Sequence, residues 1–174
     1  MRQGLGRSFP KAGVVAVGLV LLTGTWAPAQ AGVALDVTKL TSVCLFGEKP
    51  PIEAVSDHGL NREAVLNFAY VTLKSKLPRL QVERMPCGEP TLYVNVHLYT
   101  NKAGAGTKLG YYGMITVLLT RNTLWLTGQA GLGIAYSGDM VLSGPMGSAY
   151  QHLNEAIDRL LTDFAAEYYK AGNP

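Results

Sequence analysis

The residues that could do acid–base or metal chemistry are few and lie far apart in the sequence. The histidines are His58, His97 and His152. None belongs to a His-Glu-x-x-His sequence, the spacing that places two zinc ligands on one face of a helix. No Gly-x-Ser-x-Gly elbow holds a serine nucleophile. We therefore expect no catalytic residue, no metal ion and no cofactor, and an enzyme of an unrecognised type is the alternative.

The only two cysteines are Cys44 and Cys87. An exported chain with an even number of cysteines normally pairs them, and this pair would close a loop of about 43 residues. A metal or redox pair is the alternative. It would require a Cys-x-x-Cys sequence or a histidine close to one of the thiols, and the chain has neither. The sequence therefore favours a structural disulfide.

Glycine-rich turns could bind phosphate groups where they begin a helix. Of two such segments, residues 131–133 and 144–148, only the second precedes a predicted helix. It lacks the Gly-Lys-Ser/Thr ending of a phosphate-binding loop. We favour a plain turn with a helix cap at residues 144–148, and anion binding there is the alternative.

The first 31 residues have the pattern of a cleavable export signal. Arg2, Arg7 and Lys11 precede an apolar run over residues 12–22, and Ala29-Gln30-Ala31 forms a small-x-small cleavage site. The run is shorter than the roughly 20 apolar residues of a membrane-spanning helix, although a retained anchor is the alternative. The absence of an Asn-x-Ser/Thr sequon favours a bacterial periplasm. We expect residues 32–174 to form one periplasmic domain with no transmembrane segment.

The charge of the domain differs from that of the full chain, which is +3. The signal holds three of the 15 basic residues and none of the 12 acidic residues, so residues 32–174 have equal numbers of both. This balance argues against binding to nucleic acid or to an anionic membrane.

The first part of the domain predicts a strand, a loop and a helix. Apolar and polar residues alternate over residues 33–46, which we expect to form a strand with a bulge near Thr38 and Lys39. Consecutive prolines then predict a loop up to Gly59. Asn61 is a favourable N-cap for a helix that Pro78 should end.

Residues 80–142 change to a period of two and predict about four strands. One face of the second of these strands is apolar, with Leu92, Val94, Val96 and Leu98. The next strand, residues 111–126, has an apolar face with Ile115, Val117 and Leu119. Glycines weaken the last strand, residues 132–142, so its limits are the least defined.

The C-terminal segment predicts an amphipathic helix with one apolar stripe: Leu153, Ile157, Leu160, Leu161, Phe164 and Tyr168. Ser148 and Gln151 match a capping box, and Gly172 suits the C-terminal end. These elements predict an α+β domain, with a mostly antiparallel sheet of about five strands and two helices on one face, in the order β-α-β-β-β-β-α.

Two helices on one face would leave the other face of the sheet open. The residues expected there are Tyr93, Asn95, His97, Tyr99, Tyr112 and Thr116, because side chains alternate along a strand. Tyrosine suits a contact surface, although tyrosine and threonine also occur on half-exposed strands for structural reasons. We therefore predict a non-enzymatic domain that binds another protein or an envelope component. The alternative is a small-ligand carrier with a pocket between sheet and helices, and the oligomeric state is left open.

Overall fold

The computed structural model describes residues 37–124 and 130–173, so the predicted signal lies outside the described residues. A five-stranded sheet with the strand order β2-β1-β3-β4-β5 forms one layer. β1 is parallel to both of its neighbours, β2 and β3, whereas the β3–β4 and β4–β5 pairs are antiparallel. The sheet is therefore mixed rather than mostly antiparallel. The strands are β1 (Ser42–Phe46), β2 (Gln81–Arg84), β3 (Thr91–Lys102), β4 (Lys108–Leu124) and β5 (Ala130–Gly144).

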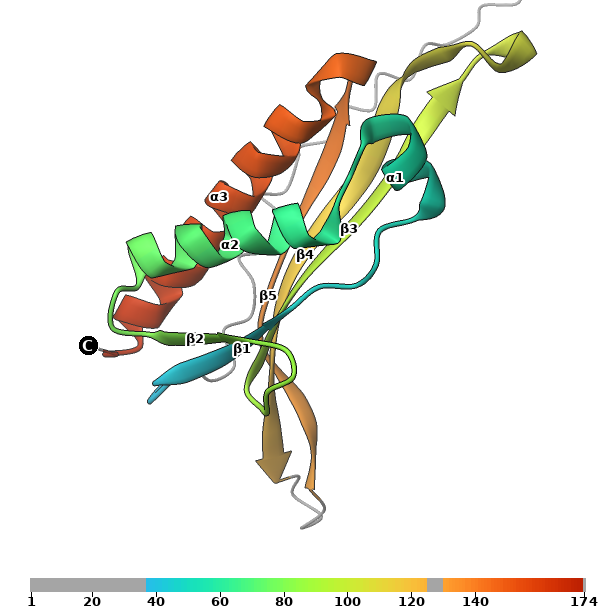
Figure 1. The fold of residues 1–174 in the computed structure, drawn as a ribbon. Coiled ribbons are helices and arrows are strands. Elements are labelled where there is room, and N and C mark those ends of the chain that lie inside the picture. Colours follow the sequence, from blue (N-terminus) through green and yellow to red (C-terminus); the bar gives the residue numbers. More distant parts are fainter. Residues whose placement is uncertain (1–36, 125–129, 174) are drawn as a thin grey trace, which may run out of the picture.

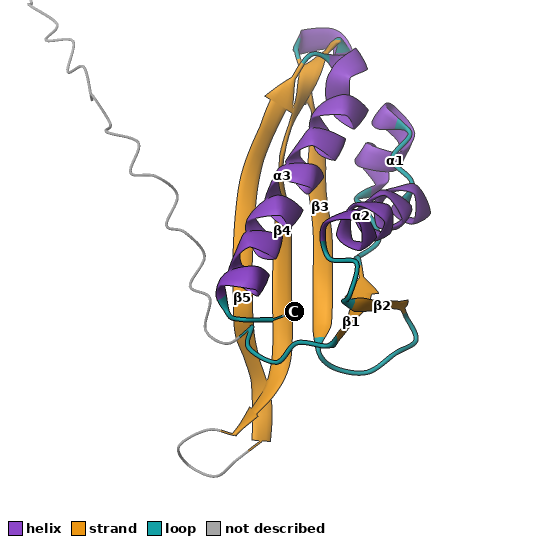
Figure 2. Cartoon of the chain, turned by 90° about the vertical axis from the view of Figure 1, so that its left-hand side faces the viewer, coloured by secondary structure: helices purple, strands orange, loops and turns teal. Residues whose placement is uncertain are grey.

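Helices cover one face of this sheet (Figure 1). They are α1 (Ile52–His58), α2 (Arg62–Lys76) and α3 (Ala149–Lys170), and Figure 2 shows all of them on the same side. The predicted α+β class and the order of the long elements are confirmed. No helix of the described residues is long and apolar enough to cross a membrane.

The short helix α1 replaces part of the loop predicted before Gly59. It begins directly after Pro51 and ends at Gly59, which has a φ angle of 64°. Proline is compatible with the start of a helix, because the first N–H groups of a helix have no partner within it. The prolines were therefore compatible with a helix start and did not require a loop.

The parallel part of the sheet follows from how the chain leaves β1 and returns. The segment that contains α1 and α2 connects β1 to the parallel strand β2. β2 then ends beside Leu45, and β3 begins on the other side of β1 at nearly the same level, with Leu92 beside Leu45. Residues 85–90 can therefore cross β1 directly. This crossing separates β2 from β3, which the predicted run of four successive strands did not anticipate.

The ends of the long helices test the capping predictions. The Asn61 side chain accepts a hydrogen bond of 2.8 Å from Glu63 N–H, so the predicted N-cap of α2 is confirmed. Ser148 is the N-cap residue of α3, as predicted, but it makes no side-chain cap hydrogen bond, so the predicted capping box is wrong. Ser148 belongs to a short 3-10 turn and its hydroxyl donates to Pro145 O, while the Gln151 amide donates to Glu155. Gly172, at a φ angle of 76°, follows the end of α3 as predicted.

The core fills the space between the sheet and the helices. Leu92, Val94, Val96 and Leu98 of β3 are at most 5% exposed, and they pack with the buried residues of β4 and with the apolar stripe of α3. The inward faces predicted for β3 and β4 are therefore confirmed.

The first strand begins later than predicted, at Ser42 rather than at residue 33. Thr38 and Lys39 form a turn, in which Lys39 has a φ angle of 57°, rather than a bulge inside a strand. Residues 33–36 lie outside the described residues. The Asn173 side chain accepts a hydrogen bond from Leu40 N–H and donates one to Val37 O, which fixes this segment to the end of α3.

Candidate partner-binding surface

The face of the sheet opposite the helices consists of alternate residues of β3, β4 and β5. Cross-strand pairing places Tyr99 beside Tyr112 and Asn95 beside Thr116. All the predicted surface residues are therefore on one face. We call this face the open face, and its residues are Tyr93, Asn95, His97, Tyr99, Tyr112, Met114, Thr116, Leu118, Ser137, Asp139, Val141 and Ser143.

The predicted residues differ in how accessible they are. Tyr99 and Tyr112 are exposed, at 39% and 53%, and their rings stack with centroids 5.7 Å apart. The other four, Tyr93, Asn95, His97 and Thr116, are half-buried. The tyrosine pair therefore provides the largest accessible aromatic area on the open face.

Two of the half-buried residues have structural contacts at the side of β1. The Tyr93 ring packs edge-on against Phe46, with centroids 5.3 Å apart. The Asn95 side chain accepts a hydrogen bond of 3.1 Å from Glu48 N–H. These contacts hold the chain that follows β1, so Tyr93 and Asn95 are less available to a partner than the tyrosine pair.

Two exposed apolar residues of this surface, Met114 and Val141, are not among the predicted contact residues. Met114 is 41% exposed and Val141 is 80% exposed, and they belong to the same cross-strand row as His97. The alternation of residues 111–126 does place Met114 on the same side as Tyr112 and Thr116, although the predicted contact surface did not include it. Val141 was harder to place, because the glycines of β5 obscure its period and a register shift occurs between Leu119 and Thr120.

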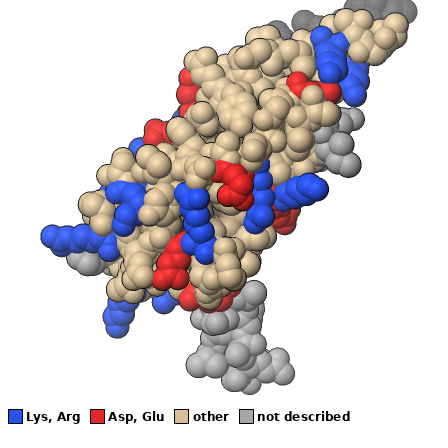
Figure 3. Space-filling view, in the orientation of Figure 1, with Lys and Arg blue, Asp and Glu red and all other residues tan. Residues whose placement is uncertain are grey.

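Charged groups are nearly absent from the open face, where Asp139 is the only carboxylate and no residue is lysine or arginine. Basic and acidic side chains are instead interspersed over the side that carries α2, β1 and β2 (Figure 3). The neighbouring lysines at the end of β3 and the start of β4, Lys102 and Lys108, both form ion pairs with Asp57. The open face therefore has no basic cluster.

A disulfide bond covers one end of the outward side of the sheet. Cys44 and Cys87 are bonded, with Cα atoms 5.6 Å apart, as predicted. Cys44 alternates with the buried residues Val43 and Leu45, so residues 85–90 cross β1 on the outward side. Glu89 of this crossing accepts hydrogen bonds from Thr91 and Thr120. The open face therefore extends from this crossing to the far end of β3.

Two of the three histidines, His58 and His152, lie on the helix side, and both contact Tyr111. His58 of α1 lies edge-on to the buried ring of Tyr111, with centroids 5.7 Å apart. A hydrogen bond joins Tyr111 Oη to His152 Nδ1 of α3. His97 is on the open face, away from this group. No group of three potential metal ligands occurs among residues 37–124 and 130–173.

A polar group around Asp57 lies where β3 ends and β4 begins. Thr100 donates a hydrogen bond of 2.7 Å to Asp57, and Lys108 lies 2.6 Å from its other oxygen. These hydrogen bonds lower the pKa of Asp57 to about 2. Burial lowers the pKa of His58, whose Nδ1 has no hydrogen-bond partner among the described residues. This polar group fixes α1 to the sheet and contains no recognisable catalytic set.

No protein-family model and no curated protein matches this chain. Among solved structures, the chain is similar to a PelC variant dodecamer from Paraburkholderia phytofirmans, with a TM-score of 0.46 and 14% identity over 76% of this chain and 90% of that chain. A second PelC dodecamer from the same organism has a TM-score of 0.44 and 13% identity over 76% and 92% of the two chains. A protein titled as uncharacterised has a TM-score of 0.34 and 13% identity over 74% and 96%. At these values, none of them assigns a function or a partner to this chain.

Proposed function

We propose that this chain is an exported, non-enzymatic domain that binds another protein through the open face of its sheet. One observation carries the proposal. Tyr99, Tyr112, Met114 and Val141 are exposed together on a face that no helix of the described residues covers. Aromatic residues and methionine are enriched in protein–protein interfaces, and charged residues are depleted from their centres. The open face has this composition.

The charge of the open face supports a protein partner over a nucleic acid or an anionic membrane. Both of those partners are bound largely through lysine and arginine, which neutralise phosphate groups. The open face has neither residue, and its one formal charge is the negative charge of Asp139. A protein surface with apolar groups and hydrogen-bond donors fits it better.

Export is part of the proposal and has two lines of support. The N-terminal residues have the pattern of a cleavable signal. The disulfide between Cys44 and Cys87 suits an oxidising compartment such as the periplasm.

Site-specific photo-crosslinking in intact cells tests the proposed surface. A benzophenone amino acid would replace Val141 on the open face in one strain and Val71 in another. Val71 is a matched control, because it is also an exposed valine, at 64%, and it lies on α2. We expect ultraviolet light to produce a discrete adduct with one protein from position 141 and not from position 71. Purification of that protein then allows direct titration.

Two results would contradict the proposal. The first is the absence of any adduct from position 141 when the protein is exported and folded. The second is the same adduct from both positions, because the partner would then not distinguish the open face from the helix side.

A further inference from the structure

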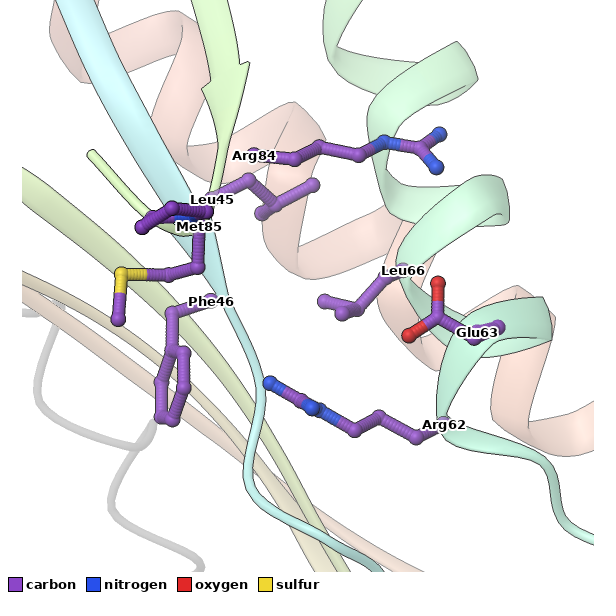
Figure 4. A pocket seen from close by; sticks show the side chains of 8 residues that line it. Leu45, Phe46, Arg62, Glu63, Leu66, Arg84 and Met85 are labelled. Atoms are coloured by element: carbon purple, nitrogen blue, oxygen red, sulfur yellow. The ribbon is translucent and has the colours of Figure 1, made fainter.

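A hollow of about 350 Å³ lies at the edge of the sheet, between β1, the start of α2 and the chain that follows β2. Figure 4 shows its lining side chains around a common space. Its volume is within the range of small-molecule sites, at the lower end. None of its lining residues belongs to the open face, although Phe46 packs against Tyr93 of that face. The lining residues are Leu45, Phe46, Arg62, Glu63, Leu66, Arg84, Met85 and Pro86.

Arg62 is held in place on the lining by two contacts. Its Nε–H donates a hydrogen bond of 2.7 Å to Gly47 O, and its guanidinium lies 5.1 Å from the centre of the Phe46 ring. Position 47 has no room for a side chain, because a Cβ atom there would lie 2.9 Å from Val94 O. In Figure 4 the guanidinium of Arg62 points from α2 toward β1 and Phe46. Its terminal nitrogens form no ion pair with a carboxylate of the described residues.

Arg84 supplies a second positive charge on another side of the hollow. Its guanidinium lies over the Tyr70 ring of α2, 4.7 Å from the ring centre, and it also has no carboxylate partner within the described part of the chain. Glu63 is the only carboxylate of the lining. The lining therefore has an excess of one positive charge beside an apolar wall formed by Leu45, Phe46, Leu66 and Met85.

We propose that this hollow binds a small organic anion with an apolar body. The anionic group would accept hydrogen bonds from Arg62, whose position is already fixed, and Arg84 would add to the positive field. The apolar body would pack against Leu66, Phe46 and Met85. The net charge of the lining favours an anion over a neutral or cationic ligand, and the apolar wall favours an anion with a hydrocarbon part over an inorganic one.

Titration calorimetry of the whole exported protein with octanoate, 1-octanol and acetate tests the ligand class. We expect octanoate to bind, octanol to bind at least about tenfold more weakly because it lacks the charge, and acetate to give no measurable binding. Equal affinity for octanoate and octanol would overturn the proposal, and so would acetate binding as tightly as octanoate.

Charge variants test the location. Arg62→Gln should weaken octanoate binding by roughly tenfold or more, Arg84→Gln should weaken it less, and Glu63→Gln should strengthen it. Arg159→Gln is the matched control, because Arg159 is exposed on α3 and does not line the hollow, and the change removes the same charge. Unchanged affinity in both Arg62→Gln and Arg84→Gln would overturn the proposal. The Arg84 side chain forms no hydrogen bond with residues 37–124 or 130–173, so Arg84→Gln stays informative if Arg62→Gln lowers the melting temperature.

Discussion

The two faces of the sheet are built from the same strands but differ in what covers them. In β3, Leu98 is fully buried and the next residue, Tyr99, is 39% exposed; in β4, Ile115 is fully buried and its neighbour Met114 is 41% exposed. The helix side matches the apolar stripe of α3 with an apolar sheet face. The open face also has apolar and aromatic residues, but none of the described helices packs on it. An antiparallel sheet with one solvated face normally has polar residues there. This difference is the basis of our proposal that the open face binds a partner.

The largest expected difference between the faces is in stability. Leu98→Ala would leave a cavity between β3 and the helices, and we expect it to lower the free energy of unfolding by about 2–5 kcal/mol. Urea unfolding, followed by circular dichroism, measures this. Val141→Ala on the open face is the control and should change the free energy by less than about 1 kcal/mol. Similar losses in both variants would mean that the open face is buried in the protein.

The disulfide bond gives the next largest effect. Replacing both Cys44 and Cys87 by serine removes a cross-link over 43 residues, and we expect a loss of about 2–4 kcal/mol in the free energy of unfolding. The same urea experiment, with and without reductant, measures it. Reductant should destabilise the wild-type protein and leave the double variant unchanged, and insensitivity of the wild type would contradict a structural disulfide.

The polar group on the helix side should make stability depend on pH. The lowered pKa of Asp57 means that its stabilising hydrogen bonds with Lys108 and Thr100 are fully present above the ordinary value of 3.8 and are lost as pH falls toward about 2. The pKa of His58 is lowered by burial, so the folded state disfavours its protonated form and stability decreases as pH falls below 6.5. Thermal melts from pH 7 to pH 2 should therefore show two steps of decreasing stability.

Variants separate these two steps. Asp57→Asn should remove the step at low pH, and His58→Gln should remove the step that begins below 6.5. A profile that both variants leave unchanged would show that this group does not control the acid sensitivity of the fold.

The smallest stability effect is expected on the open face itself. Changing Tyr99 and Tyr112 to serine removes one stacked aromatic pair, and we expect a loss of no more than about 1.5 kcal/mol. Urea unfolding of the double variant checks this. A loss of the same size as that of Leu98→Ala would mean that the pair belongs to the core, and the open face would then lose its role as a contact surface.

Local patterns in the sequence predicted the parts of this fold that depend on local physics. Alternation identified the two faces of β3, and Asn61 identified the start of α2. The position of β1 between β2 and β3 depends on pairing between distant segments, which no local pattern encodes. In the candidate surface, the alternation of side chains along a strand made the outward residues of β3 and Tyr112 of β4 predictable. Val141 was not, because the register shift of β5 and its glycines hide the alternation. The hollow beside Arg62 depends on three segments that meet only in the folded chain.

Affinity for the partner tests the central claim most directly. The protein captured by crosslinking from position 141 would be purified and titrated with the wild-type domain and with the Tyr99→Ser, Tyr112→Ser variant. Tyrosines near the centre of an interface contribute strongly, so we predict at least about tenfold weaker binding by the variant, with its fold intact by circular dichroism. Equal affinity of a folded variant and the wild type would contradict the assignment of the open face as the binding surface.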